Sequence, residues 1–291
     1  MLGIGSDSRM ISRDYRARAK ISLKNRWLNT SASVFIYNMI MGIVSSISAV
    51  VVWLMLFGMI GKTFEEIIEE TVKEYPYMKA DFDKLMKDDT YKQAVKFLDH
   101  LVGSISDLLP TLALIAIISF ILYLVLNSML SFGLYKTYLD AARMKEVQIG
   151  NLFSNIKFWR KMLGVLVYRY IIIALGYILI VPGIIFTMKY LLAPFILIDN
   201  PDISVSECIR KSSELVNGRQ WNLFCLCVSY IGWLLVASWI GSVIGGFIPF
   251  GSVIILAVFW VYFYVGIAHF YLNISRQDNT INREELYNNE N

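Results

Sequence analysis

The chain has 291 residues, of which 56% are hydrophobic and only 17% are charged. This composition, with a mean hydropathy of +0.54, excludes a pair of ordinary soluble domains. Several continuous apolar runs of roughly 20 residues could cross a hydrocarbon core of about 30 Å as helices, whereas the strands of a barrel would alternate. We therefore expect a polytopic α-helical membrane protein.

The hydropathy pattern divides the chain into nine segments, which predict an all-α bundle of six transmembrane helices with amphipathic interfacial helices. The second and fourth segments each hold one span, the sixth and eighth each hold a helical hairpin, and the others lie at the membrane surfaces. In chain order, the segments are residues 1–32, 33–60, 61–107, 108–135, 136–162, 163–198, 199–220, 221–274 and 275–291.

The N-terminal segment is a basic amphipathic helix, with seven Lys and Arg residues against Asp7 and Asp14. Apolar residues recur at every fourth position and form one stripe: Ile11, Tyr15, Ala19, Leu23 and Trp27. This pattern predicts a helix in the headgroup layer of an anionic leaflet. A nucleic-acid partner fits less well because the next residues enter the membrane. We therefore expect the lipid bilayer, with anionic lipids at its cytoplasmic face, as the partner and no nucleic acid.

Residues 61–107 form the largest polar segment, with seven lysines and eleven acidic residues. Thr63 and Glu66 make a capping box that predicts a helix start, and Pro76 ends the helical pattern. We expect two or more short helices on the extracytoplasmic surface. A cap that binds a partner or ligand is the alternative.

The distribution of charge predicts the orientation in the membrane. With six spans and an internal N-terminus, the inner segments hold 18 Lys and Arg residues against 12 acidic residues, whereas the outer segment is net negative. Because cytoplasmic loops carry an excess of Lys and Arg, we expect a bacterial plasma-membrane protein with both termini in the cytoplasm.

The hairpin of residues 163–198 has Pro182 and Gly183 at its expected turn. A surface helix follows, which begins at Ser204 and stops at Gly218. The second arm, residues 184–198, is near the lower length limit for a span. If this arm were re-entrant, the orientation of everything after it would invert.

Two cations, Arg169 and Lys189, lie on the two arms of this hairpin and are the candidate ligand-binding residues. Ionisable side chains within a span are costly and are functional candidates, although both could instead snorkel to the membrane surface. No Asp or Glu lies within an expected span, which argues against an acid-based proton relay. The anionic head of a lipid or peptide is the expected ligand.

The sequence has no Gly-rich phosphate loop, no Gly-x-Ser-x-Gly and no metal-ligand helix motif. Its histidines are His100 and His269, and its cysteines, Cys208, Cys225 and Cys227, suit neither a disulfide framework nor a metal site. We expect no enzyme activity, no metal and no cofactor.

Three blocks of sequence resemble an uncharacterised bacterial integral-membrane family, domain of unknown function nine-seven-five. The blocks are Arg16 to Trp27, then Gly133 to Tyr135 with Asn151 to Phe153, then Val181 to Pro201 with Ser204 to Gly218, Trp221 to Phe224 and Ile231 to Trp233. The family is similar to the membrane domain of some glycerophosphodiester phosphodiesterases. The resemblance implies a membrane fold and location but hardly any chemistry, and residues 61–107 look like an enlarged loop.

Two functions are open at this point. The leading hypothesis is a non-enzymatic scaffold or accessory subunit with a membrane-protein partner, because few polar groups within the spans could line a path. The alternative is a transporter or exporter component that handles a lipid-like or peptide substrate, with Lys189 as an anion contact. A polar cavity that reaches Lys189 would favour the alternative.

Overall fold

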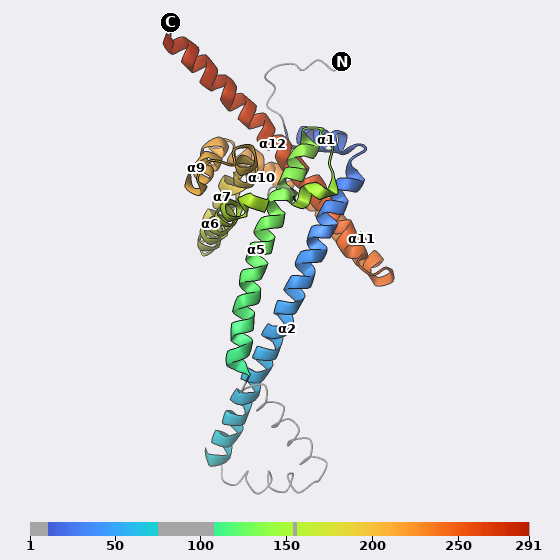
Figure 1. Ribbon diagram of the computed structural model, residues 1–291, viewed down its shortest axis with the longest axis vertical. Coiled ribbons are helices and arrows are strands. Elements are labelled where there is room, and N and C mark those ends of the chain that lie inside the picture. The colour runs from blue at the N-terminus through green and yellow to red at the C-terminus, as the bar shows by residue number, and fades with distance from the viewer. Residues whose placement is uncertain (1–10, 75–107, 154–155, 291) are drawn as a thin grey trace. The chain divides into compact units, whose positions relative to one another are not determined.

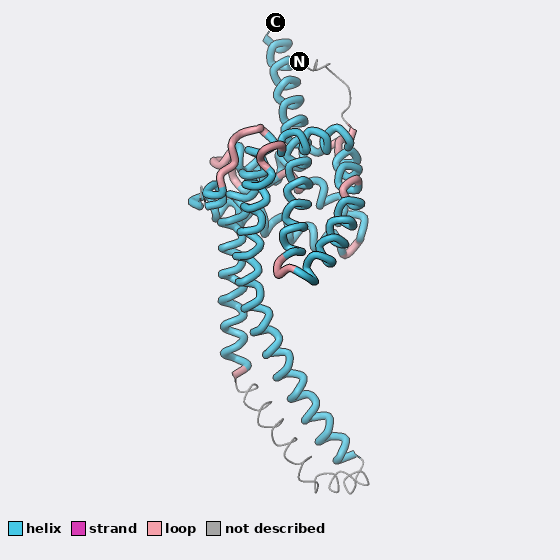
Figure 2. Tube along the Cα trace, turned by 90° about the vertical axis from the view of Figure 1, so that its right-hand side faces the viewer, coloured by secondary structure: helices cyan, strands magenta, loops and turns pink. Residues whose placement is uncertain are grey.

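The computed structural model describes residues 11–74, 108–153 and 156–290, with side chains described for residues 11–61, 108–153 and 156–276. The described residues form helices and no strand, so the all-α prediction is confirmed for them (Figure 2). Helix α2 (Trp27–Glu74) continues unbroken through Thr63, so the predicted helix start at that residue is wrong. The rest of the polar segment, from residue 75 to residue 107, lies outside the described residues.

Five stretches among the described residues are long and apolar enough to cross a membrane. They are Trp27–Gly61, Leu109–Ala142, Ile180–Asp199, Gln220–Phe247 and Gly251–Arg276. Helix α6 (Trp159–Tyr177), which was expected as the third span, is not among them because it carries three cations, Arg160, Lys161 and Arg169. The structure therefore supports a membrane protein but does not reach the expected count of six spans.

The chain divides into two compact units, Met1–Ile40 with Val125–Asn291, and Met41–Leu124. The second unit contains the later part of α2 and the first part of α5 (Leu109–Ala142). Both parts expose large apolar side chains, such as Trp53 (73% exposed) and Phe120 (59%). Outward apolar side chains on long helices are expected of a surface that faces lipid.

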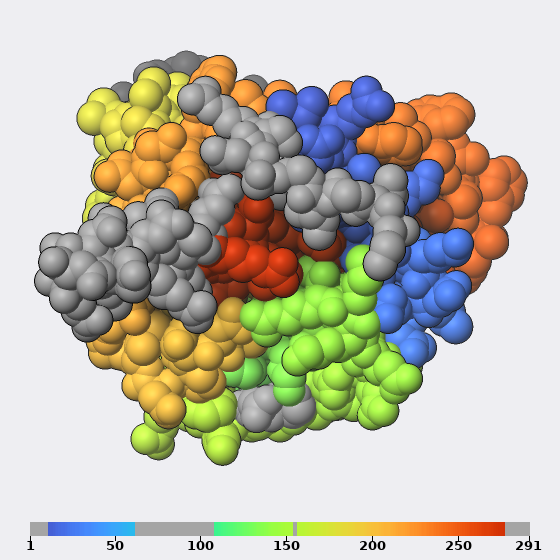
Figure 3. Space-filling model, turned by 90° about the horizontal axis from the view of Figure 1, so that it is seen from above, coloured from blue at the N-terminus to red at the C-terminus, as the bar shows by residue number. Residues whose placement is uncertain are grey.

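In the first unit, α1 (Ser12–Leu23) packs against α12 (Gly251–Glu290) and α10 (Gln220–Val228) (Figure 1). Its predicted apolar stripe is buried at Tyr15, Ala19 and Leu23, whereas cations such as Lys20 remain exposed. Arg16 ties α1 down by donating from Nη1 to the carbonyl oxygen of Ser229 at 2.7 Å. The basic helix is thus an integral part of this unit. Seen from above, the red residues of α12 lie between the blue N-terminal helix, the green end of α5 and the gold residues around α9 (Figure 3).

The hairpin consists of α6 and α7 (Ile180–Tyr190), which pack along each other. The chain turns at Ile178 and Leu179, so the turn predicted at Pro182 and Gly183 is wrong. Pro182 instead lies in the first turn of α7, where a missing N–H is tolerated. Gly183 is needed for close packing because a Cβ there would lie 2.7 Å from the ring of Tyr177.

The second arm of the hairpin is broken into two helices. Helix α7 ends at Tyr190, and α8 (Ala193–Asp199) begins with Pro194 in its first turn. The surface helix α9 (Val205–Val216) follows, and its N-cap Ser204 accepts a hydrogen bond from the Glu207 backbone N–H at 3.2 Å. The start of this helix is therefore confirmed, and Gly218, with a φ of +72°, follows its end as expected.

The remaining helices form the C-terminal part of the first unit. Helix α10 leads into α11 (Ile231–Phe247), and α11 folds back along α12. Helix α5 extends to Ala142, beyond the predicted span end at residue 135, and two short 3₁₀ turns follow it, Ile149–Phe153 and Ile156–Phe158.

Candidate ligand-binding site

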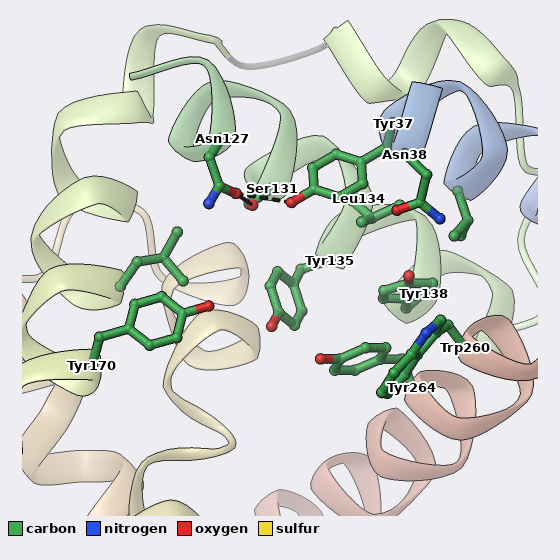
Figure 4. Close-up of a pocket in the computed structure, with 12 residues that line it drawn as sticks. Tyr37, Asn38, Asn127, Ser131, Leu134, Tyr135, Tyr138, Tyr170, Trp260 and Tyr264 are labelled. Atoms are coloured by element: carbon green, nitrogen blue, oxygen red, sulfur yellow. Dashed lines mark hydrogen bonds between the residues drawn. The ribbon is translucent and has the colours of Figure 1, made fainter. Parts of the chain in front are cut away.

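The first unit contains a cavity of about 190 Å³ with an unusually tyrosine-rich lining (Figure 4). Four helices contribute to it: the N-terminal part of α2, the C-terminal half of α5, α6 and α12. The lining residues are Val34, Tyr37, Asn38, Asn127, Ser131, Leu134, Tyr135, Tyr138, Leu166, Tyr170, Trp260 and Tyr264.

One wall of the cavity is a small hydrogen-bonded cluster between α2 and α5. The side-chain oxygen of Asn127 accepts two hydrogen bonds, from the hydroxyl of Tyr37 at 2.9 Å and from that of Ser131 at 2.8 Å. Buried polar side chains of apolar helices need such partners because no water is available in the hydrocarbon. The cluster therefore fixes these polar side chains in the cavity wall.

The opposite wall is a group of stacked tyrosines. Tyr264 of α12 stacks on Tyr138 at a ring-centroid distance of 5.0 Å, and Tyr135 meets Tyr264 edge-on at 5.5 Å. Tyr138 is almost fully buried. In Figure 4, the hydroxyls of Tyr135, Tyr170 and Tyr264 point towards the space between the helices. The site thus presents several O–H groups, each of which can donate to or accept from a ligand.

Arg169 lies in the middle of α6, one residue before the cavity-lining Tyr170. Its guanidinium lies beside Tyr135, and its Cζ lies 5.6 Å from the ring centroid of Tyr170. Although the residue as a whole is partly exposed, its Nε and Nη1 are buried and have no hydrogen-bond partner in the described part of the chain. A buried donor left unsatisfied costs about 1–3 kcal/mol, and more when it is charged. These two nitrogens therefore mark a place where an acceptor is missing.

Lys189 occupies a different position, in the last turn of α7, and is half-buried. It does not line the cavity. Its backbone carbonyl oxygen accepts a hydrogen bond from the Ser212 hydroxyl of α9 at 2.7 Å, which ties α7 to the surface helix. Neither cation lines the cavity, but Arg169 directly precedes the lining residue Tyr170, whereas both chain neighbours of Lys189 lie outside the lining.

The sequence did not single out the tyrosines as a site, although part of the signal was present. Asn127, Ser131, Tyr135 and Tyr138 recur at intervals of three and four residues in α5 and so share one helix face. A polar stripe on a long apolar helix indicates a buried interface or cavity. The contribution of Tyr264, far along the chain, has no such local signature.

Comparison with known proteins identifies a family but no characterised relative. The family model described as "Protein of unknown function (DUF975)" matches residues 10–278. No curated protein and no solved structure matches the chain. The resemblance to the membrane domain of glycerophosphodiester phosphodiesterases therefore stays a prediction. Because the match covers nearly the whole chain, the protein belongs to the DUF975 family.

Proposed function

We propose that the protein is a non-enzymatic, multi-pass membrane protein that holds the anionic group of a lipid-like or peptide ligand at Arg169. The observation that carries the proposal is the pair of unsatisfied guanidinium nitrogens, Nε and Nη1, beside the tyrosine-lined cavity. A phosphate or carboxylate oxygen is a strong acceptor for either nitrogen, and each of the two can form a two-point fork together with the neighbouring Nη2.

The cavity is suited to the anionic group rather than to a whole ligand. Its volume of about 190 Å³ lies below the range of about 300–1,000 Å³ that is typical of drug-sized ligand sites. The hydroxyls of Tyr135 and Tyr264 could contact the remaining oxygens of a phosphate. Acyl chains or peptide residues would extend beyond the enclosed space.

The lining residues favour binding over catalysis. They include no Asp, Glu, His, Cys or Lys, and these are common general bases and nucleophiles of hydrolytic sites. The lining also offers no carboxylate to hold a metal through oxygen ligands. The non-enzymatic assignment rests on this choice of side chains.

We retain six spans and a cytoplasmic location for both termini in this proposal. Helix α6 can count as a span because Arg160 and Lys161 lie in its first turn, where long basic side chains snorkel to the membrane surface. Only Arg169 then lies within the hydrocarbon, where a paired cation is tolerated. The exposed cations of α1 would face the anionic lipids of the cytoplasmic leaflet of the bacterial plasma membrane.

A thermal-unfolding assay in mild detergent tests the site. The probes are glycerol 3-phosphate, as a lipid headgroup without acyl chains, and an N-acetylated dipeptide with a free carboxylate. At a hundredfold excess over its Kd, a ligand that binds only the folded state stabilises it by about 2.7 kcal/mol. We expect one of the two probes to stabilise the wild type, and the identity of that probe indicates the ligand class.

Arg169→Gln should abolish this stabilisation, whereas the matched variant Arg160→Gln, altered at an exposed position of the same helix, should keep it. Arg169→Lys retains the charge but not the fork and should bind more weakly than the wild type. If neither probe stabilises the wild type, or if Arg169→Gln binds as the wild type does, the proposal fails.

A non-enzymatic scaffold or accessory subunit is the second candidate. It is favoured by the small volume of the cavity and by the position of Lys189 outside its lining, since a transport path would need a longer polar surface. Native mass spectrometry of the protein released from its membrane separates the two candidates. A stoichiometric membrane-protein subunit that is retained equally by Arg169→Gln would support the scaffold.

A further inference from the structure

A second, apolar cavity of about 510 Å³ lies between α11 and α12, and the N-terminal helix closes one end of it. It shares no lining residue with the tyrosine-lined cavity. We call it the α11–α12 groove. Many of its side chains are exposed, for example Trp233 (54%) and Val236 (50%), so the groove opens to the surroundings of these helices.

The groove is polar at one end and aliphatic at the other. Lys20, Trp27 and Tyr262 lie at one end, and Ile240 and Ile255 lie at the other. The seven helical steps from Trp233 to Ile240 correspond to about 10 Å along α11. A cation beside Trp and Tyr rings is typical of the membrane–water interface, and aliphatic side chains are typical of the hydrocarbon below it. This order matches the order of head and tail in an amphiphile.

Lys20 is held at the polar end by the packing of its own helix. Its neighbour Ala19 is fully buried, and the Tyr262 hydroxyl donates to the backbone carbonyl of Arg16 at 3.4 Å. The Lys20 side chain itself is exposed and makes no hydrogen bond or ion pair with the residues that the structure describes. An exposed cation on a packed helix, at the head end of an apolar groove, is complementary to an anionic headgroup.

We propose that the α11–α12 groove binds one acyl chain of an anionic phospholipid, with the lipid phosphate at Lys20 and the chain running towards Ile240. The site goes beyond the proposed function because it does not depend on Arg169. It would attach the basic helix and the C-terminal hairpin to one lipid molecule.

Native mass spectrometry of the full chain tests the proposal. The protein is first stripped of lipid and then incubated with equal amounts of phosphatidylglycerol and phosphatidylcholine that carry the same acyl chains. We expect preferential retention of one phosphatidylglycerol. Lys20→Gln should lower this preference about fivefold, which corresponds to about 1 kcal/mol for one Lys near an anionic surface. Lys24→Gln is the matched control because Lys24 is an exposed cation that follows the same helix and does not line the groove.

A second pair of variants tests the groove itself. Ala237→Trp fills it, whereas Ser238→Trp adds the same side chain at the next residue, which is exposed and outside the lining. We expect only Ala237→Trp to abolish retention of this lipid. Any of three outcomes would show annular lipid only and would overturn the proposal. They are equal retention of both lipids by the wild type, an equal loss of the preference for phosphatidylglycerol in Lys20→Gln and Lys24→Gln, and full retention of this lipid by Ala237→Trp.

Discussion

The backbone of α5 and the chain that follows it come very close together at Gly133. A Cβ built there would lie 2.0 Å from the carbonyl oxygen of Leu152 and 2.7 Å from its Cα. Because real Cβ atoms keep at least 3.0 Å from such atoms, Gly133→Ala must push the backbone at Leu152 away by about 1 Å. Leu152 is fully buried, so the shift opens its packing as well.

The cost follows from these two effects. Overpacking of a well-packed interior costs about 1–3 kcal/mol, and partial loss of a buried Leu adds a further part of its roughly 2–3 kcal/mol of burial. We expect Gly133→Ala to lower the free energy of unfolding by about 2–4 kcal/mol, and the Tm by about 5–15 °C. Thermal unfolding in mild detergent, followed by tryptophan fluorescence, measures the change.

Gly150→Ala is the matched control. Gly150 lies in the 3₁₀ turn that holds Leu152, and a Cβ there would meet nothing within 4 Å. This variant should unfold within about 0.5 kcal/mol of the wild type. If Gly133→Ala is no less stable than Gly150→Ala, the contact between α5 and the Leu152 turn does not exist as described.

Three further predictions concern Asp199 and Cys208 of the first unit. Asp199→Asn should destabilise the fold by about 1 kcal/mol, because Asp199 accepts hydrogen bonds from Arg143 at 2.6 Å and from the Tyr271 hydroxyl at 2.9 Å. The loss is no larger because both side chains of the ion pair are partly exposed (30% and 24%) and solvent screens their attraction. Glu214→Gln, which removes a more exposed ion pair, should change the Tm far less. Burial raises the pKa of the Cys208 thiol to about 12, and this thiol donates a hydrogen bond to the Ala193 carbonyl oxygen. In a variant whose only cysteine is Cys208, we therefore expect maleimide to label the native protein at pH 8 at least about a hundredfold more slowly than the denatured protein. Between pH 9 and 12 the folded state keeps a proton that the unfolded state loses, so stability should fall as the pH rises through this window, and a variant with Cys208→Ala should lose that part of the slope. Labelling of native Cys208 as fast as in denaturant would contradict its burial.

Features of single helices could be predicted from the sequence because their causes are local. The stripe of Tyr15, Ala19 and Leu23 follows from the helical period, and all three are buried in α1, together with Ser22. The spacing of Ser204 and Glu207 predicts an N-cap at Ser204, and the Ser204 hydroxyl accepts from the Glu207 backbone N–H as expected. The apolar composition likewise pointed to membrane helices before any contact was known.

The positions at which helices meet could not be predicted, because they depend on the fit between surfaces far apart in the chain. Pro182 and Gly183 looked like a turn, yet the chain turns earlier and uses Gly183 to bring α7 against Tyr177 of α6. Arg169 and Lys189 looked equivalent in the sequence, one on each arm of a hairpin.

Packing separates these two cations. The break between α7 and α8 leaves Lys189 at a helix end beside α9, whereas α6 directs Arg169 to Tyr135 of α5, next to Tyr264 of α12. The sequence by itself thus determined the all-helical class, the apolar stripe of α1, the start of α9 and the presence of two costly cations. Only the tertiary structure decided which cation lies next to a residue of the polar cavity, because hydrophobic periodicity specifies which face is buried and not which side chains it meets.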